Sequence, residues 1–273
     1  MIFSKDRPFL LVGAGKMGGA MLAGWMAEGV EPSAVVISDP SPSEEVVKLI
    51  QTHQIRHVTV PDSGLRPAVI MVAVKPQLMD AVLPTLSGCV EPDTLLLSVA
   101  AGTPVSKFKG AFGDVPIARA MPNTPAMVGR GVTAVYPNDK VTEAQKQTVG
   151  QLLSAVGNVV WLDSEEQIDL VTGVSGSGPA YVFWLAECLA QAGVEAGLPK
   201  DTAHQLAVAT VTGAGELMHQ SEETPSALRK NVTSPNGTTA AALDVLMADT
   251  GMEPLMVRAV AAAVKRAKEL AAA

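Results

Sequence analysis

The feature that most constrains this chain is a glycine-rich turn near its N-terminus. The segment Gly13-Ala14-Gly15-Lys16-Met17-Gly18 follows an apolar run, Phe9–Val12, and precedes a helical pattern at residues 16–29. In a strand–turn–helix of this kind, the first glycine permits a tight turn, the second lets the backbone approach a pyrophosphate, and the third lets helix and strand pack closely. The helix N-terminus supplies free N–H groups to the phosphates. The turn therefore predicts a dinucleotide site, and the alternative is a structural turn in an α/β sheet.

Residues 1–163 alternate between short β-branched runs and helical stretches. This pattern predicts a mostly parallel sheet with helices on both faces, a dinucleotide-binding α/β domain. We expect strands at Phe9–Val12, Val35–Ser38, Val58–Val60, Val69–Val74, Leu95–Val99, Ile117–Ala120 and Thr133–Val135. We expect helices at 16–29, 43–52, 76–87, 104–111 and 142–155.

After Asp163 the pattern is helical throughout, which predicts an all-α domain over residues 164–273. The expected helices cover 164–174, 179–196, 199–220, a short stretch after Thr224-Pro225, 238–249 and 254–271. The helix after Pro179 is apolar on nearly every side, so it must be buried almost all round, and Cys188 on it is expected to be buried. We interpret this half as a dimerisation domain. The alternative is a helix packed between two domains of one chain.

Charge and composition exclude several classes of function. The net charge is −7 and no basic block is present, so nucleic-acid binding has little support. No stretch is long and apolar enough to cross a membrane. Two distant cysteines suggest a reducing, cytoplasmic compartment, and four isolated histidines give no metal site.

The second expected strand ends at Ser38-Asp39-Pro40. Asp39 lies where an acidic residue accepts hydrogen bonds from the adenosine ribose, which favours NADH because a carboxylate repels a 2′-phosphate. The alternative is that Asp39 caps the following turn.

Two further segments end strands of the same sheet. They are Ala73-Val74-Lys75-Pro76 and Ala100-Ala101-Gly102. Ligands of open parallel sheets sit beyond the carboxyl ends of the strands, so both segments are expected to line the nicotinamide crevice. Lys75 is a weak candidate for a general acid, since a lone lysine at a strand end more often binds carbonyl groups or a phosphate.

The segment from Asn231 to Ala240 is rich in hydrogen-bond donors. Residues Thr238 to Ala240 open a helix, so their N–H groups offer a receptor for a small anion such as a carboxylate. The hydroxyl groups of Ser234 and Thr239 add donors. The alternative is an ordinary helix N-cap.

Together these segments resemble the pyrroline-5-carboxylate reductase family over nearly the whole chain. Besides the glycine turn, the matching motifs are Val74-Lys75-Pro76-Gln77, Arg119-Ala120-Met121-Pro122-Asn123-Thr124-Pro125, Thr172-Gly173-Val174-Ser175-Gly176-Ser177-Gly178-Pro179-Ala180-Tyr181 and Asn231-Val232-Thr233-Ser234-Pro235. The last motif, continued through Gly237-Thr238-Thr239 to Leu243, is the most specific.

The resemblance implies a Rossmann domain followed by a helical domain that interlocks two subunits, with dimers that often assemble into decamers. It implies hydride transfer from NADPH or NADH to the C=N bond of 1-pyrroline-5-carboxylate, giving L-proline. The Thr239 hydroxyl would be the catalytic group, bonded to the ring nitrogen. The substrate-binding residues would be Glu165, Glu222, Ser234, Gly237, Thr238 and Thr239. The cofactor-binding residues would be Gly13, Ala14, Gly15, Lys16, Met17, Gly18, Ser38, Asp39, Ala73, Val74, Lys75, Pro76, Ala100, Ala101, Gly102 and Asn231.

One position departs from the family, which often places Ser, Asn or Arg after the second strand, where this chain has Asp39. The choice between NADH and NADPH therefore stays open, since Ser38, Ser41 and backbone donors could still receive a phosphate. Two rival functions also remain. One is a two-domain reductase of β-hydroxy acids with Lys75 as the acid, and the other is a non-catalytic dinucleotide-binding regulator.

Overall fold

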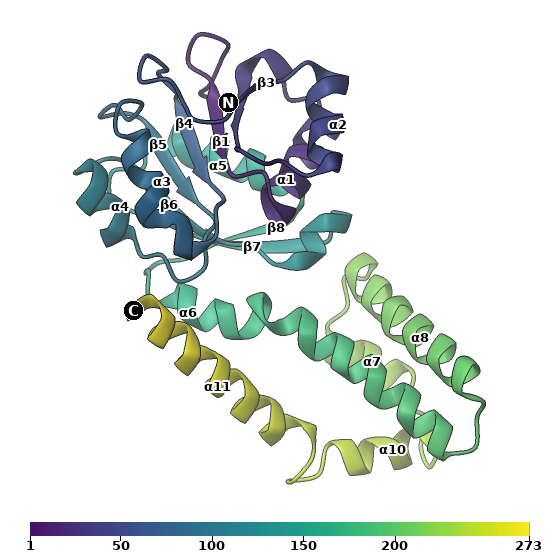
Figure 1. Ribbon diagram of the computed structural model, residues 1–273. Coiled ribbons are helices and arrows are strands. Elements are labelled where there is room, and N and C mark those ends of the chain that lie inside the picture. Colours follow the sequence, from purple (N-terminus) through teal and green to yellow (C-terminus); the bar gives the residue numbers. More distant parts are fainter. Residues whose placement is uncertain (273) are drawn as a thin grey trace. The chain divides into compact units, whose positions relative to one another are not determined.

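A computed structural model describes residues 1–272 and contains one eight-stranded sheet in the order β3-β2-β1-β4-β5-β6-β7-β8 (Figure 1). All neighbouring strands are parallel except β6 and β7, which are antiparallel. The strands are β1 (Phe9–Val12), β2 (Val35–Ser38), β3 (Arg56–Val58), β4 (Val69–Val72), β5 (Leu95–Ser98), β6 (Ile117–Met121), β7 (Gly131–Pro137) and β8 (Gly157–Trp161). The strand order reverses beside β1, which places a ligand crevice at the carboxyl ends of β1 and β4.

Helices cover both faces of this sheet because alternate strand residues point to opposite sides. Phe9 and Leu11 of β1 belong to one buried cluster, whereas Leu10 and Val12 belong to the other. The first cluster packs under α1 (Lys16–Ala27), α2 (Glu44–His53) and α5 (Glu143–Ser154). The second packs under α3 (Met79–Val82) and α4 (Val105–Phe112).

The expected α/β domain with a mostly parallel sheet is confirmed, but one strand was missed. β8 pairs in parallel with β7 and forms the edge of the sheet. Its apolar run, Val159 to Trp161, is short and follows a glycine and an asparagine, and all its residues are partly or fully exposed because it lies at the edge of the sheet. The third strand lies two residues earlier than expected, at Arg56–Val58.

The single helix expected at 76–87 was also wrong. The segment forms a 3-10 turn at Pro76–Leu78, the short helix α3, and a second 3-10 turn at Leu83–Leu86. Pro84 has no backbone N–H to donate to an α-helical carbonyl, which prevents a continuous helix through this point.

The remaining helices follow the expected order closely. They are α6 (Gln167–Val171), α7 (Gly178–Glu195), α8 (Lys200–Gln220), α9 (Pro225–Asn231), α10 (Thr238–Leu246) and α11 (Met252–Ala272). A π-helical turn at Thr172–Gly176 takes the place of the last part of the helix expected at 164–174. Thr224 caps α9 by accepting a hydrogen bond from the Ala227 N–H at 3.2 Å, as its sequence predicts.

The chain forms two compact units, one of Met1–Gly176 with Val264–Ala273 and one of Ser177–Ala263. The boundary expected after residue 163 lies just beyond Trp161, the end of the last strand, and before the division that the structure has after Gly176. The short helix α6 contacts β6 and β7 and therefore belongs to the unit that contains the sheet.

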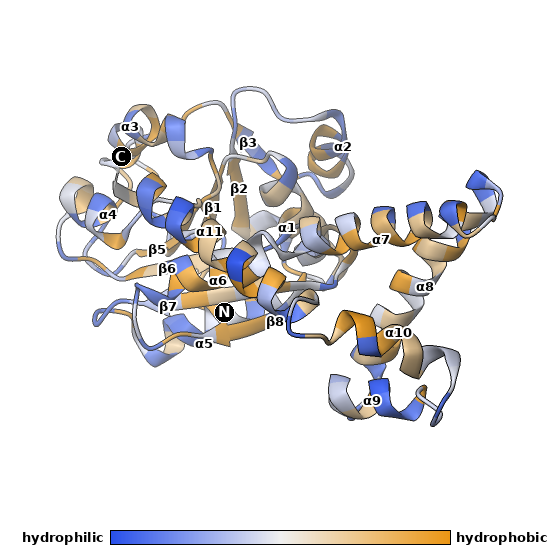
Figure 2. Ribbon diagram, turned by 90° about the horizontal axis from the view of Figure 1, so that it is seen from below, coloured by the Kyte–Doolittle hydropathy of each residue, from blue (hydrophilic) through white to orange (hydrophobic). Residues whose placement is uncertain are grey.

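Helix α7 is not buried all round within one chain, contrary to the sequence-based expectation. It packs beside α8 (Figures 1 and 2). Gly193 lies close to Ala203 of α8, but no residue of α7 is buried. Phe183 and Trp184 are 63% and 64% exposed, and Cys188 is exposed rather than buried. Two long helices cannot enclose each other, so the apolar surface of α7 needs a further partner.

Candidate functional site

The glycine turn has the geometry that a pyrophosphate site requires. Gly13 has φ of +86°, and a Cβ atom there would lie 2.7 Å from the Val74 side chain. A Cβ atom on Gly18 would collide with the Gly13 carbonyl oxygen. At Gly15, by contrast, a Cβ atom would meet nothing within 4 Å. Two glycines are therefore required by packing, while the third faces open space.

That open space lies at the start of α1. Gly15 is the N-cap residue of this helix, no side chain caps it, and its first turn contains no acidic residue. The partial positive charge and free N–H groups of the helix end are thus available to an anion. The residues present fit a dinucleotide pyrophosphate.

Asp39 lies next to this turn, and both of its carboxylate oxygens accept backbone hydrogen bonds. Oδ2 accepts from the Ala14 N–H at 2.7 Å, and Oδ1 accepts from the Ser41 N–H at 2.8 Å. Asp39 therefore caps the following turn and also contacts the glycine turn, so the two sequence interpretations do not exclude each other. Ser38 is buried, and its hydroxyl lies 3.5 Å from the Thr59 carbonyl oxygen, pointing away from solvent.

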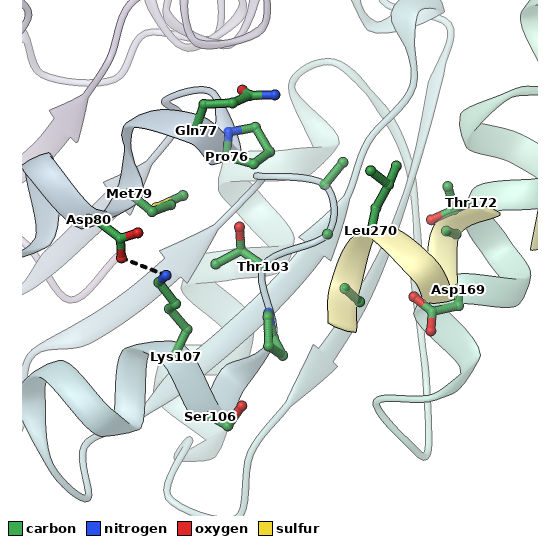
Figure 3. A pocket seen from close by; sticks show the side chains of 15 residues that line it. Pro76, Gln77, Met79, Asp80, Thr103, Ser106, Lys107, Asp169, Thr172 and Leu270 are labelled. Atoms are coloured by element: carbon green, nitrogen blue, oxygen red, sulfur yellow. Dashed lines mark ion pairs between the residues drawn. The ribbon is translucent and has the colours of Figure 1, made fainter. Parts of the chain in front are cut away.

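A cavity of about 580 Å³ opens where β4 and β5 end (Figure 3). It brings together Pro76, Ala101 and Gly102, three of the residues predicted to line the nicotinamide crevice. Leu270 of α11 forms part of its wall, and an ion pair of 2.6 Å joins Lys107 to Asp80 beside it. The residues of the glycine turn do not line this cavity.

Lys75 does not line the cavity either. It is exposed and begins the 3-10 turn at Pro76–Leu78. Within residues 1–272 its ammonium group makes no hydrogen bond or ion pair, so the structure gives no carboxylate or carbonyl that would tune it as a general acid.

A buried ionic cluster that the sequence did not predict surrounds Glu165. The Arg119 side chain is 5% exposed, and its Nη1 donates to Glu165 Oε1 at 2.7 Å. The same oxygen accepts from the Val105 N–H at 2.8 Å, and Asp169 Oδ1 lies 3.9 Å from Arg119 Nη2. Glu165 therefore already has two donors on one oxygen. An arginine inside a buried strand was the signal, because a buried guanidinium needs an anionic partner.

The second candidate region lies in the helical unit, at the start of α10. Gly237 is the N-cap residue, no side chain caps the helix, and no acidic residue is present in the first turn. Asn236 has φ of +58°, and Gly237 packs so closely on Ser234 that a Cβ atom would collide with the hydroxyl. Over the described part of the chain, the hydroxyls of Thr238 and Thr239 have no hydrogen-bond partner. The start of α10 is therefore an uncapped helix end, and its role as an anion receptor stays a prediction.

Glu222 and Asn231 lie in the same unit. The Asn231 amide donates to both carboxylate oxygens of Glu223, at 3.2 and 3.0 Å. Glu223 was not predicted from the sequence, whereas the predicted Glu222 is exposed. Among the described residues, no group of three or more His, Cys, Asp or Glu side chains is arranged to hold a metal ion, and no helix is long and apolar enough to cross a membrane.

Comparisons with known proteins cover both units. Residues 165–270 match the family model of pyrroline-5-carboxylate reductase dimerisation, and residues 9–102 match a model described as NADP oxidoreductase, coenzyme F420-dependent. The dimerisation match supports a homo-oligomer.

Full-length relatives agree with these models. The chain is 42% identical over 262 residues to a pyrroline-5-carboxylate reductase of Pseudomonas aeruginosa, with 95% of each chain covered. It superimposes on the structure of a pyrroline-5-carboxylate reductase from Coxiella burnetii with a TM-score of 0.89 and 34% identity, covering 97% and 98% of the two chains. A Plasmodium falciparum pyrroline carboxylate reductase with NADP bound gives a TM-score of 0.79 and 26% identity, covering 98% and 99%. This chain belongs to the pyrroline-5-carboxylate reductase family.

Proposed function

We propose that this protein reduces 1-pyrroline-5-carboxylate to L-proline with NADPH or NADH as the hydride donor, the last step of proline biosynthesis. It is an NAD(P)H-dependent oxidoreductase acting on a CH–NH bond. The observation that carries the proposal is the uncapped N-terminus of α10, where the hydroxyls and first-turn N–H groups of Thr238 and Thr239 are available, while the Gly237 N–H donates to the Ser234 carbonyl oxygen at 3.0 Å.

The cofactor end of the site rests on the carboxyl ends of β1, β2, β4 and β5. The pyrophosphate would lie on the N-terminus of α1, where Gly15 leaves room and where Lys16 and Met17 offer N–H groups. The nicotinamide half would lie along the residues that end β4 and β5. Residues Ala73 to Pro76 and Ala100 to Gly102 remain its proposed contacts, and Asn231 is proposed as a further cofactor-binding residue.

The substrate end rests on the loop before α10. The carboxylate of the imino acid would meet the backbone of Gly237 and Thr238, with Ser234 beside it, and the Thr238 N–H would be the donor because the Gly237 N–H donates to the Ser234 carbonyl oxygen. The Thr239 hydroxyl would bond to the ring nitrogen. Glu165 and Glu222 are proposed to line the same end, Glu165 through the carboxylate oxygen that Arg119 and Val105 leave free.

The reaction requires little from the protein beyond positioning the substrate and the cofactor. A cyclic imine is activated once it is protonated, so a strong general acid is not required. The main contribution is to hold the imine carbon against the nicotinamide carbon that carries the hydride, a proximity effect. A site of backbone donors and hydroxyl groups suits this reaction.

The proposal includes assembly and location. The exposed apolar surface of α7 and the dimerisation match favour a homodimer formed through residues 164–273, and the family resemblance extends this to a higher oligomer such as a decamer. Both cysteines are free, which is compatible with a reducing cytoplasm.

A spectrophotometric assay tests the function. Purified protein should consume NAD(P)H only when pyrroline-5-carboxylate is added, and L-proline should accumulate in equal amount. Oxidation of a β-hydroxy acid with the oxidised cofactor, without imine reduction, would favour the rival reductase. Tight cofactor binding with no turnover of either substrate would favour the regulator.

A further inference from the structure

Asp39 holds a negative charge in a fixed position beside the glycine turn. Its two carboxylate oxygens accept from the N–H groups of Ala14 and Ser41 at 2.7 and 2.8 Å. Its carbonyl oxygen lies 2.8 Å from His57 Nε2, which further restrains the residue. The carboxylate therefore cannot turn away without leaving the Ala14 N–H unpaired.

No lysine or arginine pairs with this carboxylate within the part of the chain that the structure describes, and His57 contacts the backbone carbonyl oxygen of Asp39. Asp39 forms no ion pair, and the first lysine or arginine that follows it in the sequence is Lys48, on α2. A 2′-phosphate site normally contains an arginine near the end of the second strand. Here the residue at that position is Asp39, whose carboxylate oxygens only accept hydrogen bonds.

The acceptors that remain suit a ribose diol. Each carboxylate oxygen has two lone pairs and uses one for a backbone N–H, so each can accept one further hydrogen bond. The 2′- and 3′-hydroxyl groups of an adenosine ribose supply two donors. A 2′-phosphate supplies no donor and brings about two negative charges against the fixed carboxylate.

We propose that Asp39 makes this reductase selective for NADH over NADPH. The inference rests on the proposed function only for the identity of the reaction that uses the nucleotide. The nucleotide preference itself depends on Asp39 and the glycine turn, which both lie in the sheet-containing unit. It separates this chain from the Plasmodium relative, which was solved with NADP bound.

The test measures dissociation constants without imine substrate, by titrating the purified protein with NADH and with NADPH and following nucleotide fluorescence. We expect NADH to bind at least about tenfold more tightly. Adenosine 2′,5′-bisphosphate and AMP, used as competitors, should show the same preference for the unphosphorylated ribose. Since the repulsion is electrostatic, the ratio of the dissociation constants for NADPH and NADH should decrease as salt is added.

Two variants and one control assign the preference to the residue. Asp39→Ser and Asp39→Asn should each shift the ratio of the two dissociation constants toward NADPH, by about tenfold or more. Asp62→Asn is the matched control, because Asp62 also accepts a backbone N–H, from Gly64 at 2.9 Å, in an exposed loop away from the turn. The ratio of the two dissociation constants for Asp62→Asn should equal that of the unmodified protein.

Three results would overturn the inference. They are equal or tighter binding of NADPH by the unmodified protein, an unchanged ratio in a folded Asp39 variant, or an equal shift in the Asp62 control. Absence of proline formation with either nucleotide would instead contradict the proposed function. The binding ratio is measured without imine substrate, so it would still support or overturn the role of Asp39 in that case.

Discussion

Thr239 is the residue on which the proposed chemistry depends most. Replacing it with valine removes the hydroxyl and keeps the shape, so kcat/KM should fall about 10- to 100-fold while the affinity for NAD(P)H stays unchanged. Steady-state kinetics and nucleotide titration measure the two effects. Thr85→Val is the control, because the Thr85 hydroxyl bonds only to a carbonyl of its own exposed turn. Unchanged kcat/KM in Thr239→Val would remove the residue from the reaction.

At this scale the sequence predicted residue types better than residue contacts. The glycine spacing was enough to predict the turn, because Gly13 and Gly18 follow from local geometry that any such strand–turn–helix shares. The turn that Asp39 caps was predictable, but its bond with Ala14 and the bond of Arg119 with Glu165 were not. Their hydrogen bonds join segments 25 and 46 positions apart, and a local sequence pattern carries no information on such distances.

Arg119 on β6 pairs with Glu165, which lies in the segment before α6. The same oxygen of Glu165 accepts the N–H of Val105 at the start of α4, so the cluster joins three elements. Arg119→Met should lower the free energy of unfolding by about 2–4 kcal/mol, because Glu165 would lose its charged partner in a largely buried setting. Urea denaturation measures the change. Arg7→Met, which breaks an exposed pair with Asp93, should cost less than about 1 kcal/mol. Equal losses in the two variants would contradict the account of the cluster.

The start of the edge strand β8 gives a second test at this scale. Gly157 has φ of +142°, and a Cβ atom would collide with the Gly131 backbone. Gly157→Ala should therefore destabilise the protein by about 2–4 kcal/mol. Gly110→Ala on the exposed face of α4, where a Cβ atom meets nothing, should be neutral or stabilising by up to about 1 kcal/mol. A tolerated Gly157→Ala would argue against this pairing of β7 and β8.

Elements with a strong apolar run or a clear cap were predictable, and elements defined by their neighbours were not. β1 and β2 have the predicted bounds because both are buried four-residue runs. β8 owes its existence to pairing with β7 rather than to its own composition.

On the scale of the whole molecule, we expect a second copy of the chain to cover the exposed apolar surface of α7, in line with the match to a dimerisation family model. Trp184→Asp should convert the assembly into smaller species or unfold the helical unit, since it places a charge where an apolar surface is to be buried. Light scattering coupled to size exclusion gives the mass. Val60→Asp, at an exposed position of the sheet-containing unit, should leave the mass unchanged. A monomeric mass for the unmodified protein at micromolar concentration would contradict the dimer.

The sequence predicted this surface as buried, and the single chain leaves it exposed. The apolar pattern records the environment of a residue in the assembled protein, and it does not say which chain supplies the cover. Fold class and family could be predicted from one sequence because both follow from patterns that extend over many residues.

The most direct test of the central claim follows the hydride itself. The protein is incubated with pyrroline-5-carboxylate and with NADH or NADPH carrying deuterium at the transferable position of the nicotinamide. We predict L-proline with one deuterium on the ring carbon that was double-bonded to nitrogen, detected by mass spectrometry and NMR. Unlabelled proline, deuterium at another carbon, or no proline with either cofactor would contradict the account.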